Sequence, residues 1–236
     1  MKIPKLDREL RAIFGKSEDW DNDGIMIDCG NEIKSVLVAL DVTIDAIETA
    51  KKIGADAIIT HHPLIFNKLE CINIDESVSK RAIMCIKNNI SVCAYHTCLD
   101  IYDGGVNDCL CKAIGIKNTV NFLPFARVGE LLNKTSYDDF VKSVEKSLNT
   151  KAFMLVDSKK AVKKVAVVSG GGKDYIFDAY KTGADTYLTG EVNHSAMIDA
   201  AVYKINLVCC GHYETENVVV SALAKIIETL IKTVTF

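Results

Sequence analysis

The sequence predicts an α/β fold made of two intertwined, pseudo-symmetric repeats, each containing a βαβ unit, that form one compact unit. Short apolar runs alternate with helical patterns, and the same arrangement occurs twice along the chain. With 236 residues, 49% of them hydrophobic, the chain is long enough to bury a large core.

The first βαβ unit begins with an apolar strand at residues 35–40. Thr43 is placed to cap the following helix, and Gly54 is placed to end it. Residues 57–60 then form the second strand. Because a helix joins the two strands, we expect them to run parallel.

The same unit recurs 129 residues later. Its first strand is residues 165–168, its helix 174–182 and its second strand 186–189. The triplet Gly54-Ala55-Asp56 returns at this offset as Gly183-Ala184-Asp185. This repetition indicates an internal duplication.

Further along the chain the offset becomes 116 residues. At this offset His96 aligns with His212, and Asp100 aligns with Glu216. Each repeat therefore supplies a strand that ends in histidine, with an acid four residues later, a spacing that brings two side chains together on a helix. We expect the two halves to present matching ligands to one central metal site.

The sequence divides into a first repeat at residues 1–116, a connecting segment at 117–162 and a second repeat at 163–236. Within the connecting segment, Ser136 is placed to cap a helix. We expect this segment to have a packing role and the two repeats to intertwine as one structural domain.

Composition excludes several classes of function. A formal charge of −3 with scattered lysines gives no electrostatic footprint for nucleic acid. No stretch is long and apolar enough for a membrane span, and the N-terminus lacks the apolar core of a signal peptide. Nine cysteines without a Cys-x-x-Cys pair favour a reducing cytosol, so we expect a cytoplasmic protein.

The adjacent histidines His61 and His62 follow the second predicted strand. In an extended chain their side chains point to opposite faces, so they are poorly suited to one ion but can serve two. Asp100 and Glu216 are the candidate bridging carboxylates. The alternative is a strand end held by Pro63, with no ligand bound.

Other polar and sulfur-containing residues carry weaker signals. His194 lies in a polar turn and is predicted not to bind metal, although it can contact a substrate at the rim. The glycine run Ser169-Gly170-Gly171-Gly172 either cradles an anion or makes a tight strand-to-helix connection. Four thiols near the histidines are either soft ligands or small buried hydrophobic groups: Cys93, Cys98, Cys209 and Cys210.

Taken together, these motifs resemble the family of GTP cyclohydrolase 1 type 2 homologues, which is known for a dinuclear metal centre in a toroidal hexamer. The motifs that carry the resemblance are Trp20-Asp21-Asn22-Asp23-Gly24, Ala39-Leu40-Asp41-Val42-Thr43, Gly54-Ala55-Asp56, His61-His62-Pro63, His96-Thr97-Cys98-Leu99-Asp100, Gly104-Gly105-Val106-Asn107 and Gly211-His212-Tyr213-Glu214-Thr215-Glu216. They span nearly the whole chain.

The resemblance implies metal ligands at five positions: His61, His62, Asp100, His212 and Glu216. It places His96 beside the centre as a sixth ligand, an orienting residue or a catalytic proton shuttle. Two residues depart from the family pattern, namely Asp23 in place of Val or Ile and Cys98 in place of Asn.

The implied function is hydrolysis by a water that two divalent ions activate, with a nucleotide such as GTP as the substrate. Zinc, iron, manganese and cobalt all suit histidine and carboxylate ligands. The resemblance also implies a homohexamer. Two other functions remain open, a non-catalytic metal-binding or regulatory scaffold and a metal-dependent phosphoesterase.

Overall fold

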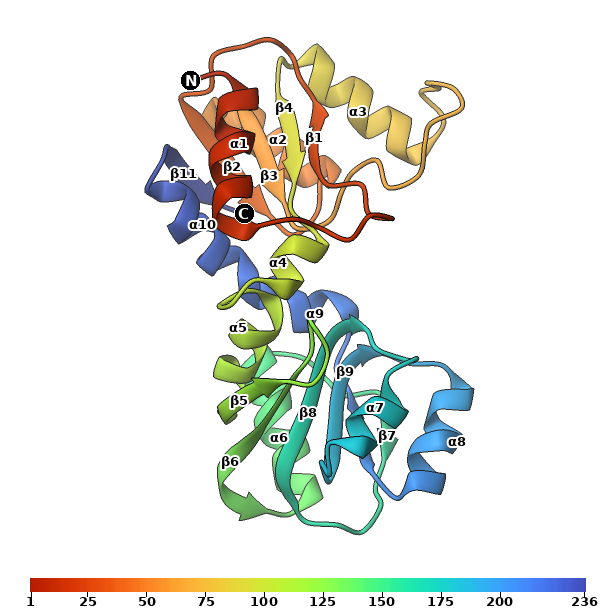
Figure 1. Cartoon of the computed structure of the whole chain (residues 1–236). Helices are drawn as coiled ribbons and strands as arrows, with labels where there is room; N and C mark the ends of the chain where they lie inside the picture. The colour runs from red at the N-terminus through yellow and green to blue at the C-terminus, as the bar shows by residue number, and fades with distance from the viewer. The chain divides into compact units, whose positions relative to one another are not determined.

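The computed structural model describes all 236 residues, and its helices and strands confirm the α/β class predicted from the sequence. The residues divide into two compact units, Met1–Tyr102 with Val220–Phe236, and Asp103–Val219. Each unit contains a β-sheet of its own (Figure 1). No helix combines the length and apolar character needed to cross a membrane.

The first unit is built on a five-stranded sheet of order β1-β4-β3-β2-β11. β1 is antiparallel to β4, and all other neighbouring strands are parallel. The strands are β1 (Gly24–Ile27), β2 (Ser35–Ala39), β3 (Ala57–Thr60), β4 (Ser91–Ala94) and β11 (Lys232–Thr235). The helices are α1 (Ile3–Phe14), α2 (Ile44–Ile53), α3 (Ser77–Lys87), α4 (Thr97–Ile101) and α10 (Val220–Glu228).

The βαβ unit of β2, α2 and β3 forms as the sequence predicts. The Thr43 side chain accepts a hydrogen bond from the Ala46 backbone N–H and so caps α2. Gly54 ends the helix with a φ of +67°, a conformation that glycine adopts without steric penalty. β2 and β3 are parallel, as expected for strands joined by a helix.

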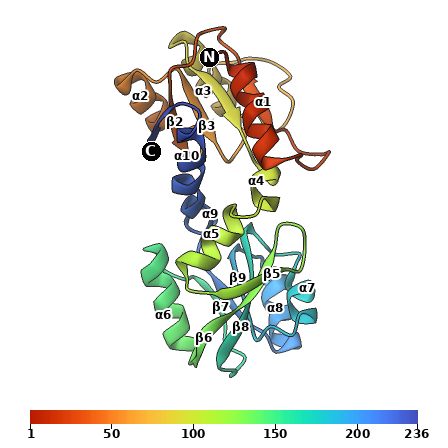
Figure 2. The same ribbon diagram turned by 60° about the vertical axis from the view of Figure 1, so that its left-hand side comes forward.

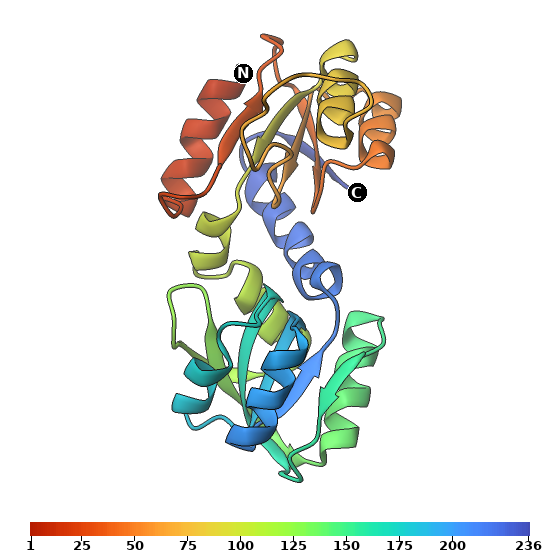
Figure 3. The same cartoon turned by 90° about the vertical axis from the view of Figure 1, so that its right-hand side faces the viewer.

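Helices cover both faces of the first sheet (Figure 3). Side chains of α2 and α3 pack with Leu37 and Ile58 in one buried cluster. Because side chains alternate along a strand, Val36 and Val38 point to the opposite face, on which α1 lies.

The second unit is built on a six-stranded sheet of order β5-β6-β8-β9-β10-β7, whose β8, β9 and β10 are parallel. The strands are β5 (Lys117–Asn121), β6 (Arg127–Thr135), β7 (Met154–Val156), β8 (Val162–Gly171), β9 (Thr186–Glu191) and β10 (Asn206–Cys209). The helices are α5 (Val106–Ala113), α6 (Tyr137–Leu148), α7 (Ile176–Lys181), α8 (His194–Tyr203), α9 (His212–Glu216) and the 3₁₀ turn η1 (Asn217–Val219).

The second sheet is also covered on both faces (Figure 2). α5 and α6 pack with Val165, Val167 and Leu188, whereas α7 and α8 pack with Ala166 and Tyr187. β8 is longer than the predicted strand at residues 165–168, because it pairs with β6 on one side and β9 on the other.

Residues 117–162, expected to connect the repeats, form β5, β6, α6 and β7. Three of the six strands of the second sheet therefore come from this segment. Ser136 caps α6, as predicted, by accepting a hydrogen bond from the Asp139 backbone N–H. The segment is thus part of the second sheet and its packing.

The duplication is visible in the strand register. Val38 pairs with Ile59 in the first sheet, and Val167 pairs with Leu188 in the second, so the predicted offset of 129 residues is confirmed for the first two strands.

At the third strand of each repeat, the offset of 116 residues predicted from the sequence is wrong by one residue. Tyr95 N donates to Thr60 O, and the equivalent bond joins Cys210 N to Thr189 O, which makes the offset there 115 residues. Consequently His96 is the N-cap of α4, whereas His212 is the first residue of α9. The predicted equivalence of His96 with His212 is therefore wrong.

Candidate metal centre

His61 and His62 directly follow the end of β3 at Thr60. The Thr60 hydroxyl donates to the His62 backbone oxygen (2.7 Å), which bends the chain, and the two imidazole centroids lie 4.9 Å apart. β3 ends at Thr60, so His61 and His62 are not part of the extended strand. The expectation that their side chains point to opposite faces is therefore wrong.

The His61 ring is fully buried and is oriented by the backbone. Its Nδ1 lies 3.1 Å from the Tyr95 carbonyl oxygen. A carbonyl oxygen only accepts, so Nδ1 is the donor in this contact and Nε2 is the nitrogen left to bind a metal. Asp100 Oδ1 lies 3.8 Å from this Nε2.

Carboxylates orient the two other histidines of the first unit. His62 Nδ1 donates to Asp41 Oδ1, and His96 Nδ1 donates to Asp21 Oδ1, both at 2.9 Å. A carboxylate on Nδ1 fixes the tautomer and makes Nε2 a better metal ligand. Asp41 follows β2, so its position at a strand end resembles that of the histidines.

These three histidines form one group, which we call the histidine cluster (His61, His62 and His96). One ligand atom from each lies within 4.8 Å of the others. Three oriented imidazoles with the Asp100 carboxylate near His61 fit the preferences of a divalent transition metal. His96 was expected beside the centre as a sixth ligand, an orienting residue or a proton shuttle, and its ligand atom lies within 4.8 Å of those of His61 and His62.

The turn that carries His96 is held by two acidic residues from the segment before β1. Burial raises the pKa of Asp21, but hydrogen bonds from His96 and Thr97 outweigh it, so the pKa of this carboxyl lies below its usual value. Burial raises the pKa of Asp23 above its usual value. Asp23 also accepts a hydrogen bond from the Cys98 thiol, so the two departures from the family pattern contact each other.

The second unit carries the other two predicted ligands, which we call the His–Glu pair (His212 and Glu216). They lie one turn apart on α9, and His212 Nε2 is 3.0 Å from Glu216 Oε2, which confirms the predicted i,i+4 proximity. Glu191 Oε2 lies 3.4 Å from His212 Nδ1. The His212 side chain is 39% exposed, and that of Glu216 is 7% exposed.

Gly170 makes room for the His–Glu pair. Its φ is +59°, and a Cβ there would overlap Glu216 Oε1 and lie 3.1 Å from His212 Nε2. Its backbone N–H donates to Thr215 Oγ1 (3.0 Å), which ties β8 to α9. Neither role expected for the glycine run, an anion cradle or a tight connection, includes this close approach.

The remaining candidates lie elsewhere. His194 is the exposed first residue of α8, which Asn193 caps. No group of three or more potential ligands includes His194 or a cysteine. The four thiols considered as soft ligands are all buried, which fits the alternative of small hydrophobic side chains.

Sequence reasoning gave no role to the residues that orient the histidines. Asp21 and Asp41 lie within the motifs that carry the family resemblance, and the position of Asp41 after a strand was a usable signal. Tyr95 acts through its backbone oxygen, and Glu191 is 21 residues from His212. Those two contacts depend on tertiary packing and have no pattern in the sequence.

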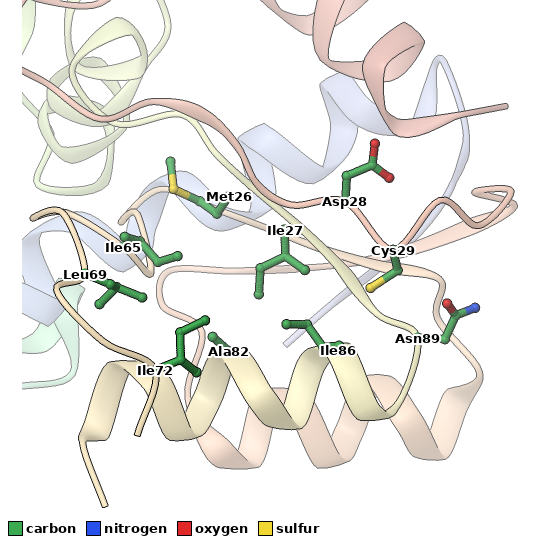
Figure 4. A pocket seen from close by; sticks show the side chains of 10 residues that line it. All are labelled: Met26, Ile27, Asp28, Cys29, Ile65, Leu69, Ile72, Ala82, Ile86 and Asn89. Carbon is green, nitrogen blue, oxygen red and sulfur yellow. The ribbon is translucent and has the colours of Figure 1, made fainter. Parts of the chain in front are cut away.

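An apolar groove of about 430 Å³ lies in the first unit between β1, α3 and the segment before α3 (Figure 4). Its lining residues are Met26, Ile27, Asp28, Cys29, Ile65, Leu69, Ile72, Ala82, Ile86 and Asn89. None of these residues is a proposed metal ligand, so the groove is not part of the candidate metal centre.

Comparisons with known proteins agree with these observations. A family model described as Duf34/NIF3 (NGG1p interacting factor 3) matches residues 3–236. A Clostridium perfringens protein named GTP cyclohydrolase 1 type 2 homolog is 33% identical over 230 residues, covering 93% of this chain and 88% of that protein. A Campylobacter jejuni protein of the same name is 32% identical, covering 98% and 93%. The crystal structure of a Bacillus cereus protein related to NIF3 has the same fold, with a TM-score of 0.93 and 22% identity over 100% of this chain and 96% of that one.

Proposed function

Because the chain belongs to the Duf34/NIF3 family, we propose that it binds two divalent metal ions and hydrolyses a nucleotide with their help. The ligands of these two ions per chain are His61, His62, Asp100, His212 and Glu216, and His96 is the catalytic residue. Similarity to proteins named GTP cyclohydrolase 1 type 2 homologs makes GTP the first substrate to test.

The histidine cluster carries this proposal. Its three rings each donate Nδ1–H to a fixed acceptor, and one ligand atom from each ring lies within 4.8 Å of the others. Orienting three imidazoles in this way costs conformational entropy and desolvation, which binding of a cation would offset. Bound divalent ions would supply Lewis-acid chemistry, polarising the substrate and lowering the pKa of water toward 7.

The chain's own residues have distinct roles in this proposal. His61 is rigid because it is buried, whereas His96 is partly exposed and can exchange a proton with a reacting group. Asp100 and Glu216 supply negative charge that compensates the cations. Gly170 leaves the space into which the Glu216 carboxylate extends.

The metal content tests the first half of the proposal. Protein produced without an affinity tag is expected to contain two transition-metal ions per chain by elemental analysis. Far fewer ions, not restored by added zinc, iron, manganese or cobalt, would contradict the dinuclear centre.

Turnover tests the second half. Protein with its native metals is expected to hydrolyse GTP, the His212→Ala variant to lose this activity, and a His194→Ala control to retain it. Activity only on phosphoesters would identify a phosphoesterase. No metal-dependent turnover on any substrate would favour the scaffold function.

From the same resemblance we expect a cytoplasmic homohexamer. Sedimentation velocity is expected to give a single species of six times the chain mass of 25.9 kDa. A monomer across the micromolar range would contradict this expectation.

A further inference from the structure

The segment between α1 and β1 holds the turn that carries His96. We call residues 17–23 the N-terminal clamp. Asp21 and Asp23 of this clamp hydrogen bond to the turn, the Thr97 hydroxyl accepts from the Glu18 backbone N–H (3.0 Å), and Ser17 Oγ accepts from the Cys98 backbone N–H (3.2 Å). The clamp therefore contacts the turn through both side chains and backbone.

Asp21 makes the decisive contacts within the clamp. Its side chain is fully buried and accepts four hydrogen bonds, three of them from the turn. Oδ1 accepts from His96 Nδ1 (2.9 Å), while Oδ2 accepts from the Thr97 backbone N–H (3.0 Å) and the Thr97 hydroxyl (2.8 Å). One carboxylate thus fixes both the imidazole ring and the first residue of α4.

Asp23 holds the backbone of His96. Its Oδ1 accepts from the His96 backbone N–H (3.0 Å), and its Oδ2 accepts from the Ser17 hydroxyl. Its own backbone oxygen accepts from Arg11 Nη2 (2.8 Å), which anchors the clamp to α1. Of the two aspartates, only Asp21 hydrogen bonds to the ring, so the ring orientation and the backbone position of His96 depend on different carboxylates.

We propose that Asp21 is the positioning residue of His96, fixing the Nδ1–H tautomer so that the Nε2 lone pair is available beside His61 and His62. A ring without this carboxylate can rotate about χ2 or adopt the other tautomer, and both changes take the Nε2 lone pair away from His61 and His62, where it can serve as a sixth ligand beside the five proposed ones. The consequence for metal binding rests on the proposed function. The tautomer itself does not.

The first experiment measures the tautomer in metal-free protein labelled with ¹⁵N-histidine. A two-bond ¹H–¹⁵N spectrum distinguishes the two ring nitrogens, and the His96→Gln variant identifies the His96 signals. We expect wild-type His96 to be the Nδ1–H tautomer. A wild-type ring protonated on Nε2 would overturn the proposal, even if no Asp21 variant folds.

The second experiment compares three variants. Asp21→Asn keeps the size of the side chain but lets its amide donate to Nδ1, so we expect the tautomer to shift and cobalt affinity, measured by chelator competition, to fall 10- to 100-fold. Thr97→Val loses the hydroxyl contacts of the clamp without touching the ring, so it is expected to lower Tm but leave the tautomer unchanged. Asp19→Asn is the control, because Asp19 is exposed and pairs only with Lys16.

The outcomes separate the positioning role of Asp21 from the proposed metal-dependent function. An unchanged tautomer in Asp21→Asn would overturn the positioning role. An equal fall in cobalt affinity in Thr97→Val would also overturn it, because general loosening of the turn would then be the cause. If the wild type binds no cobalt while the tautomer shifts in Asp21→Asn, the proposed function fails and the positioning of the ring stands.

Discussion

The turns between β4 and α4 and between β10 and α9 begin alike but present their histidines differently. Both follow a parallel strand, and both make the same backbone bond to the neighbouring strand. Yet His96 precedes its helix and is oriented by a buried aspartate, whereas His212 begins its helix and lies beside an acid one turn later. Duplication has kept the strand-to-helix turn while the support of the histidine differs.

The two regions therefore rely on different kinds of support. The histidine cluster is held by acceptors from several segments of the first unit: Asp21, Asp41 and the Tyr95 oxygen. The His–Glu pair depends on one helical turn, an exposed Glu191 and the space left by Gly170. We expect the first region to be preorganised and the second to adapt more readily when a ligand binds.

The largest expected difference concerns stability without metal. His61→Ala leaves the Tyr95 oxygen without its donor and opens a cavity, so we expect a loss of about 3 kcal/mol in the free energy of unfolding. His212→Ala removes a partly exposed ring and should change it by no more than about 0.5 kcal/mol. Urea denaturation in the presence of EDTA measures both. Equal losses would show that the two regions are equally integral to the fold.

Gly170→Ala tests how the His–Glu pair is accommodated. The new Cβ would overlap Glu216 Oε1, so the carboxylate must move, and we expect metal affinity to fall about 100-fold, as for the loss of one of the proposed ligands. The positive φ adds a cost of about 1 kcal/mol to folding. Chelator competition measures the affinity.

Gly171→Ala is the matched control for this change. Its Cβ would meet no atom within 4 Å, so affinity and Tm should stay near those of the wild type. Similar losses in both variants would mean that the strand end, and not the space beside Glu216, determines metal binding.

The sequence predicted the two strands of each βαβ unit, the caps at Thr43 and Ser136 and the proximity of His212 to Glu216. These features depend on local patterns of period two or 3.6 and on capping chemistry. The approach of His61 to His62 was not predicted, because it depends on where β3 stops. The one-residue difference between the turns was also invisible, since equal spacing in sequence does not fix the position where a helix begins.

The carboxylates that contact the histidines should give a smaller difference between the two regions. Asp41→Asn weakens a 2.9 Å contact to a partly buried ring, and we expect cobalt affinity to fall about 10-fold. Glu191→Gln alters a 3.4 Å contact at an exposed position, where solvent screens the charge, so a change of about twofold is expected. A larger loss in Glu191→Gln would show that the second region is the more preorganised one in solution.

The reactivity of Cys93 on β4 and of Cys209 on β10 should differ least between the two regions, because both thiols are buried. Burial raises the pKa of Cys209 to about 12, and burial also raises the pKa of Cys93, which lies on β4. At pH 8 we therefore expect Ellman's reagent to modify exposed Cys71 first and to reach Cys93 and Cys209 only after unfolding in urea. Peptide mass spectrometry identifies the sites, and Cys71→Ser should remove the fast phase. Modification of Cys209 but not Cys93 in the native protein would show that the second region opens, which is the asymmetry expected if α9 is held less firmly than α4.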